Sequence, residues 1–275
     1  MSAAADATTP QAARHDTVLA EYGRTRRRLV IEAGAVLLVV LVAAAYVKLL
    51  DFPTLARGVP AIFAIMRESF PPDFSDALSW WKPLIDTLAM SIAGTAIAVF
   101  LSLPLAFLAA QNTSPHPIVF YCARTVLNGL RSVPELIMGI TFVAAVGFGA
   151  LPGVLALGLH SVGMVGKFFA ESIEHVDEEP VEAAHATGAT TLQVLYHAVL
   201  PQVLPQFAAV AIYRWEYNFR ASTVIGMVGA GGIGFELMSS LRILQYQQVS
   251  AIMLVILVMV IIVDWFSGVL RRKFK

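Results

Sequence analysis

Three ionisable residues stand close together in a segment that is otherwise apolar: Arg214, Glu216 and Arg220. Ionisable groups inside a bilayer cost about 2.5–3.5 kcal/mol each on insertion scales, so they usually face a partner or a water-filled cavity. Glu216 precedes Arg220 by four residues, the favourable order for an ion pair on a helix. Two interpretations stay open. Either the residues form an internal ion pair that positions the helix, or an arginine faces a pathway and offers its planar cation to an anion.

A glycine cluster follows this segment, at Gly229, Gly231, Gly232 and Gly234. Its G-x-G-x-x-G spacing matches a dinucleotide fingerprint, but that fingerprint needs a preceding strand and an acidic residue about 20 positions on. Here a helix-length apolar run precedes the cluster, and the acid Glu236 comes too soon. We therefore expect a closely packed turn at the outer end of the helix, with a gate or hinge role for the glycines.

An acidic stretch lies earlier in the chain, between Lys167 and Arg214, where no Lys or Arg occurs. Its six carboxylates belong to Glu171, Glu174, Asp177, Glu178, Glu179 and Glu182. Pro180 suits the first turn of a helix, and Gly188 predicts its end. A second short helix should then run from Thr190 or Thr191 to Leu200-Pro201. Such a loop is either a solvated charged segment or the contact surface for a protein partner.

Patterns typical of enzymes are absent from the sequence. There is no H-E-x-x-H zinc motif and no G-x-S-x-G nucleophile motif. Gly166-Lys167 lacks the upstream glycine of a phosphate-binding loop, so we expect no ATP binding by this chain. We predict no catalytic residues, no metal site and no bound cofactor. His160 is interpreted as a packing residue.

The composition points to a membrane. Hydrophobic types make up 57% of the 275 residues and charged types 14%, with a mean hydropathy of +0.72 and a formal net charge of zero. An ordinary soluble domain has about 25% charged residues. These values exclude a soluble globule and a disordered chain, and they argue against a nucleic-acid partner.

Apolar runs long enough to cross a bilayer predict six transmembrane helices. The expected layout is a cytoplasmic tail 1–28, helix 29–50, a periplasmic loop 51–83 with a short helix near 60–70, helices 84–110, 133–149, 154–169, 207–228 and 249–270, a cytoplasmic loop 171–205 and a cytoplasmic tail 271–275. Residues 118–130 are expected to form an in-plane helix on the cytoplasmic side. The inside segments hold eleven Lys and Arg and the outside segments four, as the positive-inside rule requires.

One spaced pattern identifies a family. Glu182-Ala183-Ala184, three residues, Gly188, nine residues, and then Ala198-Val199-Leu200-Pro201 resembles the EAA loop of ABC importer permeases. The only departure is Ala198, where the family has isoleucine. In that family the loop is a coupling helix seated in a cleft of the ATP-hydrolysing subunit. The resemblance implies the all-α, type-I ABC importer permease fold, with coupling residues Glu182, Ala183, Ala184, Gly188, Leu200 and Pro201.

Further segments indicate the subfamily. Residues 70–74, residues 224–234 and the set Arg214, Glu216 and Arg220 resemble the permease of phosphonate importers, a group that includes phosphite importers. The likeness spans about residues 65–272. It implies an inner-membrane permease that works by alternating access, that is itself no enzyme, and whose candidate anion pathway includes these three residues.

The expected partners follow from the same resemblance. They are two copies of an ATPase that binds ATP and Mg²⁺, a periplasmic substrate-binding protein, a second copy of this chain and the lipid bilayer, with both termini cytoplasmic. A type-I importer for another small solute, such as methionine, an osmolyte or phosphate, remains an alternative. A secondary transporter or a membrane enzyme is a more remote one.

Overall fold

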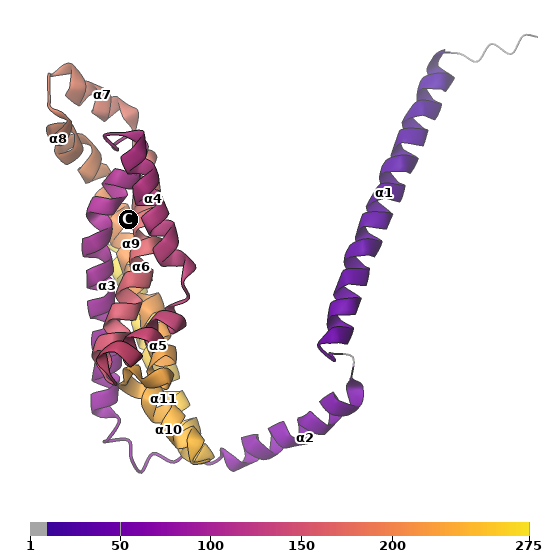
Figure 1. Ribbon diagram of the computed structural model, residues 1–275, viewed down its shortest axis with the longest axis vertical. Coiled ribbons are helices and arrows are strands. Elements are labelled where there is room, and N and C mark those ends of the chain that lie inside the picture. The colour runs from indigo at the N-terminus through magenta and orange to yellow at the C-terminus, as the bar shows by residue number, and fades with distance from the viewer. Residues whose placement is uncertain (1–9, 50, 275) are drawn as a thin grey trace, which may run out of the picture. The chain divides into compact units, whose positions relative to one another are not determined.

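A computed structural model describes residues 10–49 and 51–274, and every regular element within those ranges is helical (Figure 1). The chain divides into two compact units, Met1–Met66 and Arg67–Lys275. The expected tail before residue 10 lies outside the described residues. The predicted all-helical membrane fold is thus confirmed for the described part of the chain.

The first unit contains α1, Pro10–Tyr46, and most of α2, Phe52–Glu68. Thr25–Tyr46 is long and apolar enough to cross a membrane, and no residue of its most apolar part is buried within the protein. That exposure suits a helix surrounded by lipid. The helix starts well before the expected position 29, because residues 10–28 are rich in alanine and arginine, which are strong helix formers.

The second unit is a helical bundle (Figure 1). Its helices are α3 Trp81–Ala109, α4 Pro117–Ser132, α5 Glu135–Val146, α6 Ala150–Glu174, α7 Glu178–Ala186, α8 Thr191–Val194, α9 Leu200–Ile225, α10 Gly232–Arg242 and α11 Tyr246–Arg272, with wide π-type turns η1 at Leu195–Val199 and η2 at Gly226–Ala230. α3 and α6 approach closely because glycines face the partner helix. A Cβ added to Gly94 would lie 2.9 Å from Leu157 Cβ, and one on Gly158 would lie 3.1 Å from Ile97.

The predicted crossing 133–149 takes a different form. α5 has 12 residues, about 18 Å of helix, against a hydrocarbon core of about 30 Å. It follows α4 after a bend of 83°, and only the bent pair together qualifies as a span. Pro134 keeps Val133 extended, which ends α4, and Gly147 ends α5 at φ 90°. Five helices therefore qualify as spans in the described part of the chain, or six with the bent pair.

The boundaries of the predicted loop 171–205 and helix 207–228 also differ in the structure. α6 continues to Glu174, and α8, η1 and α9 form one helical run instead of ending at Leu200-Pro201. The wide turn explains the continuity, because the Leu200 N–H bonds to Leu195 O, five residues back. Pro201 follows directly after this wide turn. Its missing N–H costs little helical structure there, because the backbone hydrogen bonds have already shifted from the α-helical to the π-helical spacing.

Candidate functional site

The predicted coupling segment forms α7, which projects with α8 from one end of the bundle (Figure 1). The Asp177 carboxylate caps the helix by accepting a hydrogen bond of 3.2 Å from Glu179 N, and Glu178 and Glu179 place negative charge in the first turn. Gly188 then turns the chain back at φ 79°, a conformation that other residues rarely adopt. No residue of α7 is buried, and Glu182 and Ala183 are exposed at the surface.

The return from α7 is firmly built into the bundle. Thr190 N donates to Gln193 Oε1 at 2.8 Å, which starts α8. Ala198 and Val199 are buried, so the alanine that replaces the family isoleucine lies in the packed part of the segment. Gln202 accepts a hydrogen bond of 2.9 Å from Asp177 N. Leu200 and Pro201, expected at the end of the loop, instead begin α9. The last part of the coupling segment and this membrane helix therefore form one continuous helical run.

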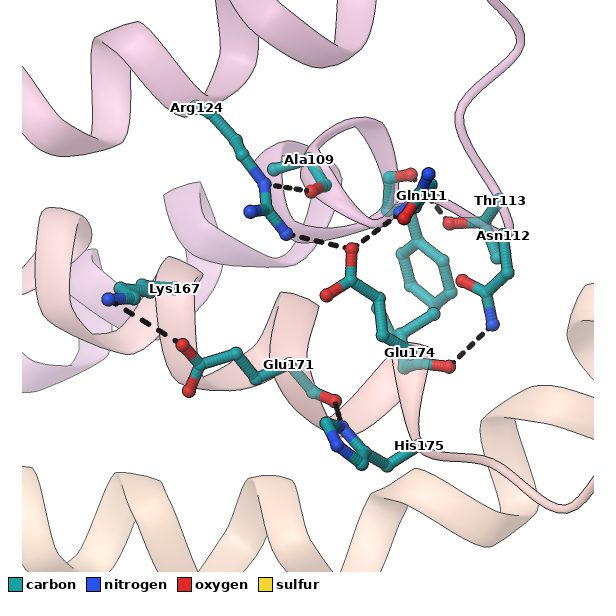
Figure 2. A network of polar contacts seen from close by, with 11 residues as sticks. Ala109, Gln111, Asn112, Thr113, Arg124, Lys167, Glu171, Glu174 and His175 are labelled. Atoms are coloured by element: carbon teal, nitrogen blue, oxygen red, sulfur yellow. Dashed lines mark hydrogen bonds and ion pairs between the residues drawn. The ribbon is translucent and has the colours of Figure 1, made fainter. Parts of the chain in front are cut away.

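A polar network fastens the base of this segment (Figure 2). Arg124 of α4 donates to Glu174 Oε1 at 2.7 Å and to Ala109 O at 3.0 Å, and the same carboxylate oxygen accepts from Gln111 N at 2.7 Å. Asn112 Nδ2 donates to Ile173 O at 2.7 Å. The turn between α3 and α4 is thereby tied to the end of α6, directly before α7. Local sequence patterns could not reveal this, because Arg124 and Glu174 lie 50 positions apart.

Arg214 faces the bundle interior, where its side chain is only 4% exposed. Nε donates to Ser161 Oγ of α6 at 2.8 Å, and the guanidinium lies over the Tyr217 ring, 4.3 Å from its centre. Nη2 is 3.9 Å from Glu135 Oε2, and within the described part of the chain neither of these two buried atoms has a hydrogen-bond partner. Such a position suits an anchor for α6 rather than a group open to a passing solute.

Glu135, at the start of α5, is approached from two other helices. Tyr217 O–H donates to Oε1 at 3.1 Å, and His160 Nε2 lies 3.6 Å from Oε2. His160 Nδ1 is also 3.0 Å from Val133 O, so this residue holds both sides of the bend before α5. We call Glu135, His160, Arg214 and Tyr217 the Glu135 junction. The sequence analysis missed it because the four residues come from three separate helices.

Glu216 lies on a different side of α9 and belongs to a second cluster. Its carboxylate, 8% exposed, accepts from Arg220 Nη2 at 2.8 Å, Ser267 Oγ at 3.0 Å and Arg271 Nη2 at 3.1 Å. We call these four residues the Glu216 cluster. The expected Glu216–Arg220 contact is present, but Arg214 is not part of it. The structure therefore divides the three residues between two clusters, one toward α5 and α6 and the other toward α11.

The glycine cluster is enclosed by helices. Gly229, Gly231 and Gly232 have φ values of 108°, 78° and 70°, and Gly229, Gly232 and Gly234 are buried. Gly229 O accepts from Gly149 N at 3.2 Å, and Ile233 N donates to Thr87 Oγ1 at 2.9 Å. A Cβ on Gly232 would lie 2.5 Å from that oxygen. The expected close packing is explained by these contacts, and within the described residues no strand precedes the cluster.

The loop after α2 is held against the start of α11. Asp73 N donates to Gln247 O at 3.1 Å, and Gln248 Nε2 donates to Asp76 Oδ2 at 2.8 Å. Ser75 N donates to Asp73 Oδ1 at 2.9 Å, and this bond to the charged form lowers the pKa of the Asp73 carboxyl. The segment 70–74 therefore belongs to an ordered surface rather than to a loose connection.

A sequence family described as "Binding-protein-dependent transport system inner membrane component" matches residues 102–275. The chain belongs to this family. It is 68% identical, over the full length of both chains, to the phosphite transport system permease protein PtxC of Stutzerimonas stutzeri. It is 45% identical over 225 residues to the phosphate-import permease protein PhnE of Mycolicibacterium smegmatis, covering 81% of this chain and 42% of that one.

Solved structures agree on the fold. An inward-facing form of the MetNI methionine ABC transporter matches with a TM-score of 0.64 at 20% identity, covering 73% of this chain and 99% of the matched one. The predicted type-I ABC importer permease fold is therefore confirmed, and the chain is a multi-pass permease of the inner membrane. Its family implies an ATPase and a substrate-binding protein as partners.

Proposed function

We propose that this chain is the membrane-spanning subunit of an ATP-driven importer for phosphite. The observation that carries the proposal is the 68% identity to a phosphite permease without a gap in coverage at either end. Phosphonates, which share the charged phosphorus–oxygen group, are the second substrate class to test. Phosphate is a third, because a phosphate-import permease is 45% identical over 81% of the chain.

The proposed assembly contains two copies of this chain and two ATPase subunits. Each chain has one coupling helix, α7, and ABC transporters use two. ATP and Mg²⁺ bind the ATPase, so this chain is not itself an enzyme. The substrate-binding protein docks on the opposite, periplasmic face, which includes the ordered segment 70–76. Both termini then lie in the cytoplasm.

In this proposal, movement of the ATPase reaches the membrane helices through the continuous helical run of α8, η1 and α9 and through two polar clusters on α9. A displacement of α7 passes through the turn at Gly188 to α8, and from there through η1 into α9 without a further break in helical structure. α9 is attached to α5 and α6 through the Glu135 junction and to α11 through the Glu216 cluster. Buried glycines at the end of α9 allow close packing where the helix changes direction into α10. In this proposal they are the hinge for alternating access.

Arg220 is the better candidate for attracting an anion than Arg214. Its side chain is 44% exposed, and together with Arg271 it surrounds a single carboxylate, which leaves one positive charge in excess. Arg214 is buried beneath Tyr217 and already bonded to Ser161. An arginine with free donors attracts phosphorus oxyanions without enclosing them, as transport requires.

The proposal is tested by uptake. A strain that lacks the chromosomal gene should fail to grow with phosphite as the sole phosphorus source and recover when the gene is restored. Parallel cultures on a phosphonate and on phosphate identify the substrate. A strain without the ATPase separates ATP-driven import from a secondary transporter. Unchanged growth on phosphite in the deletion strain, with no other uptake route for phosphite, would refute the phosphite assignment.

A further inference from the structure

A polar cavity of about 260 Å³ lies between α4 and α6, apart from both clusters on α9. It is lined by Ala109, Arg124, Leu127, Asn128, Arg131, Lys167, Ala170 and Glu171. We call it the α4–α6 pocket. Nothing in the proposed coupling or transport route uses it, so its chemistry needs a separate explanation.

The pocket is a product of helix spacing. Arg124, Asn128 and Arg131 are four and three residues apart on α4 and therefore share one face. Leu127 is buried against α6, where a Cβ on Gly163 would lie 2.6 Å from Leu127 O and one on Gly166 would lie 2.5 Å from Leu127 Cδ2. The two helices are thus in close contact here, and Leu127 contributes an apolar part of the pocket lining.

The charges of the pocket are unevenly satisfied. Arg124 is bonded to Glu174 and Ala109 O and serves as a fixed wall, while Lys167 Nζ lies 3.6 Å from Glu171 on the opposite side (Figure 2). Arg131 makes one long contact, 3.5 Å from Nη2 to Asn128 Oδ1. No carboxylate in the described part of the chain lies within ion-pair distance of Arg131. The two acids therefore leave one cation in excess, with most of its donors available.

We propose that the α4–α6 pocket binds a phosphorus oxyanion, held by Arg131 and Lys167 with Asn128 as a neutral donor. Arginine presents a planar fork that matches two oxygens of such a group, and lysine adds a compact charge. Basic pockets between membrane helices on the cytoplasmic side are suited to anionic head groups. The oxyanion has two sources with the same chemistry, the phosphate of an anionic lipid or free phosphite released to the cytoplasm. Only the second source depends on the proposed function.

The experiment compares variants of the permease assembled with its ATPase in nanodiscs. One arm uses phosphatidylcholine alone and titrates inorganic phosphite against thermal unfolding. The other replaces part of the lipid with phosphatidylglycerol and measures how much of that lipid stays bound on purification. The test variant is Arg131→Gln with Lys167→Gln. Arg272→Gln with Lys273→Gln removes the same charge from the exposed C-terminal end and is the matched control. Asn128→Glu is a second test variant, since it offers Arg131 an internal partner without removing a cation.

Loss of two charge-assisted contacts should weaken binding about 10- to 100-fold in one arm, with the control unchanged. Loss confined to the phosphatidylglycerol arm identifies a lipid site, and this result stands even if the chain imports no phosphite. Loss confined to the phosphite arm identifies a site for the free anion. If both test variants bind phosphite and phosphatidylglycerol as the control does, the pocket is no oxyanion site and the proposal is overturned.

Discussion

Glu216, on α9, and Glu135, which approaches α9 from α5, each meet two basic side chains, but with very different geometry. Glu216 accepts hydrogen bonds of 2.8, 3.0 and 3.1 Å, and both of its oxygens are used. Glu135 has Oε2 at 3.6 and 3.9 Å from His160 and Arg214, beyond hydrogen-bond distance, and that oxygen has no partner. The attachment of α9 to α11 is therefore saturated, whereas its attachment to α5 is incomplete.

This difference assigns different mechanical roles to the two clusters. A buried carboxylate whose two oxygens both accept hydrogen bonds resists displacement, because each lost hydrogen bond leaves its charge less compensated in a low-dielectric environment. The Arg214–Glu135 pair, held 3.9 Å apart, can close into a direct hydrogen bond or lengthen further without breaking one. We expect α9 and α11 to move together during transport, and α5 to move relative to α9 through the Glu135 junction.

The largest effect should come from Glu216→Ala. It removes the hydrogen bonds from Arg220, Ser267 and Arg271 to a buried carboxylate, and a net contribution of about 1 kcal/mol per hydrogen bond gives a loss of about 3 kcal/mol. The midpoint of thermal unfolding of the purified permease should fall strongly, and little protein should reach the membrane. Glu216→Gln, which keeps an acceptor for Ser267, is the control and should be milder. A stable Glu216→Ala protein would show that the cluster is not the main attachment of α11.

Glu135→Ala should destabilise less, although Arg214 is the more deeply buried arginine. The only hydrogen bond lost is that from Tyr217, and the cost of an unpaired buried group is about 1–3 kcal/mol. The specific consequence should be functional. ATP hydrolysis by the assembled complex should continue while substrate uptake per ATP falls, because α5 no longer follows α9. Equal losses of stability in Glu135→Ala and Glu216→Ala would mean that the two clusters are equivalent.

Arg220→Ala should have a smaller effect on stability, at most about 1 kcal/mol for a half-exposed ion pair. Arg271 still forms an ion pair with Glu216, and Ser267 still donates a hydrogen bond to it. If Arg220 supplies positive potential to the anion, uptake should fall while ATPase assembly, measured by co-purification, is retained. Arg220→Lys keeps the charge and should restore much of the uptake. Normal uptake by a well-folded Arg220→Ala protein would show that Arg220 has only a structural role, as the ion-pair partner of Glu216.

The contrast between local and distant information explains what the sequence predicts well. The helix and the turn at Gly188 that the sequence predicts for the coupling segment are present in the structure, because the pattern that predicts them lies within 20 residues. The sequence does not separate the two α9 clusters, because Arg214 and Glu216 are only two positions apart yet contact residues more than 50 positions away in opposite directions along the chain.

The errors in helix boundaries have a similar cause. The apolar composition of 133–149 predicts a crossing, whereas Pro134 and Gly147 limit the helix there to 12 residues. Pro201 predicts a helix end, whereas a π-type turn, which depends on Leu200 N bonding to Leu195 O, carries the helix through. Hydropathy reports how much apolar surface a segment has, but the surrounding helices decide how the backbone bends.

The smallest predicted effect provides the finest comparison of the two sides. Ser267→Ala and Tyr217→Phe each remove one hydroxyl that donates to a carboxylate, at 3.0 Å to Glu216 and at 3.1 Å to Glu135. Hydrogen bonds between membrane helices average about 0.6 kcal/mol, so neither variant should unfold the protein. Because Glu216 keeps two arginines at short distance, Ser267→Ala should leave uptake per ATP unchanged. Tyr217→Phe removes the only hydrogen bond that Glu135 makes to α9, so it should reduce that ratio at nearly the same stability. Equal ratios in the two variants would show that the incomplete geometry of the Glu135 junction has no part in coupling α9 to α5.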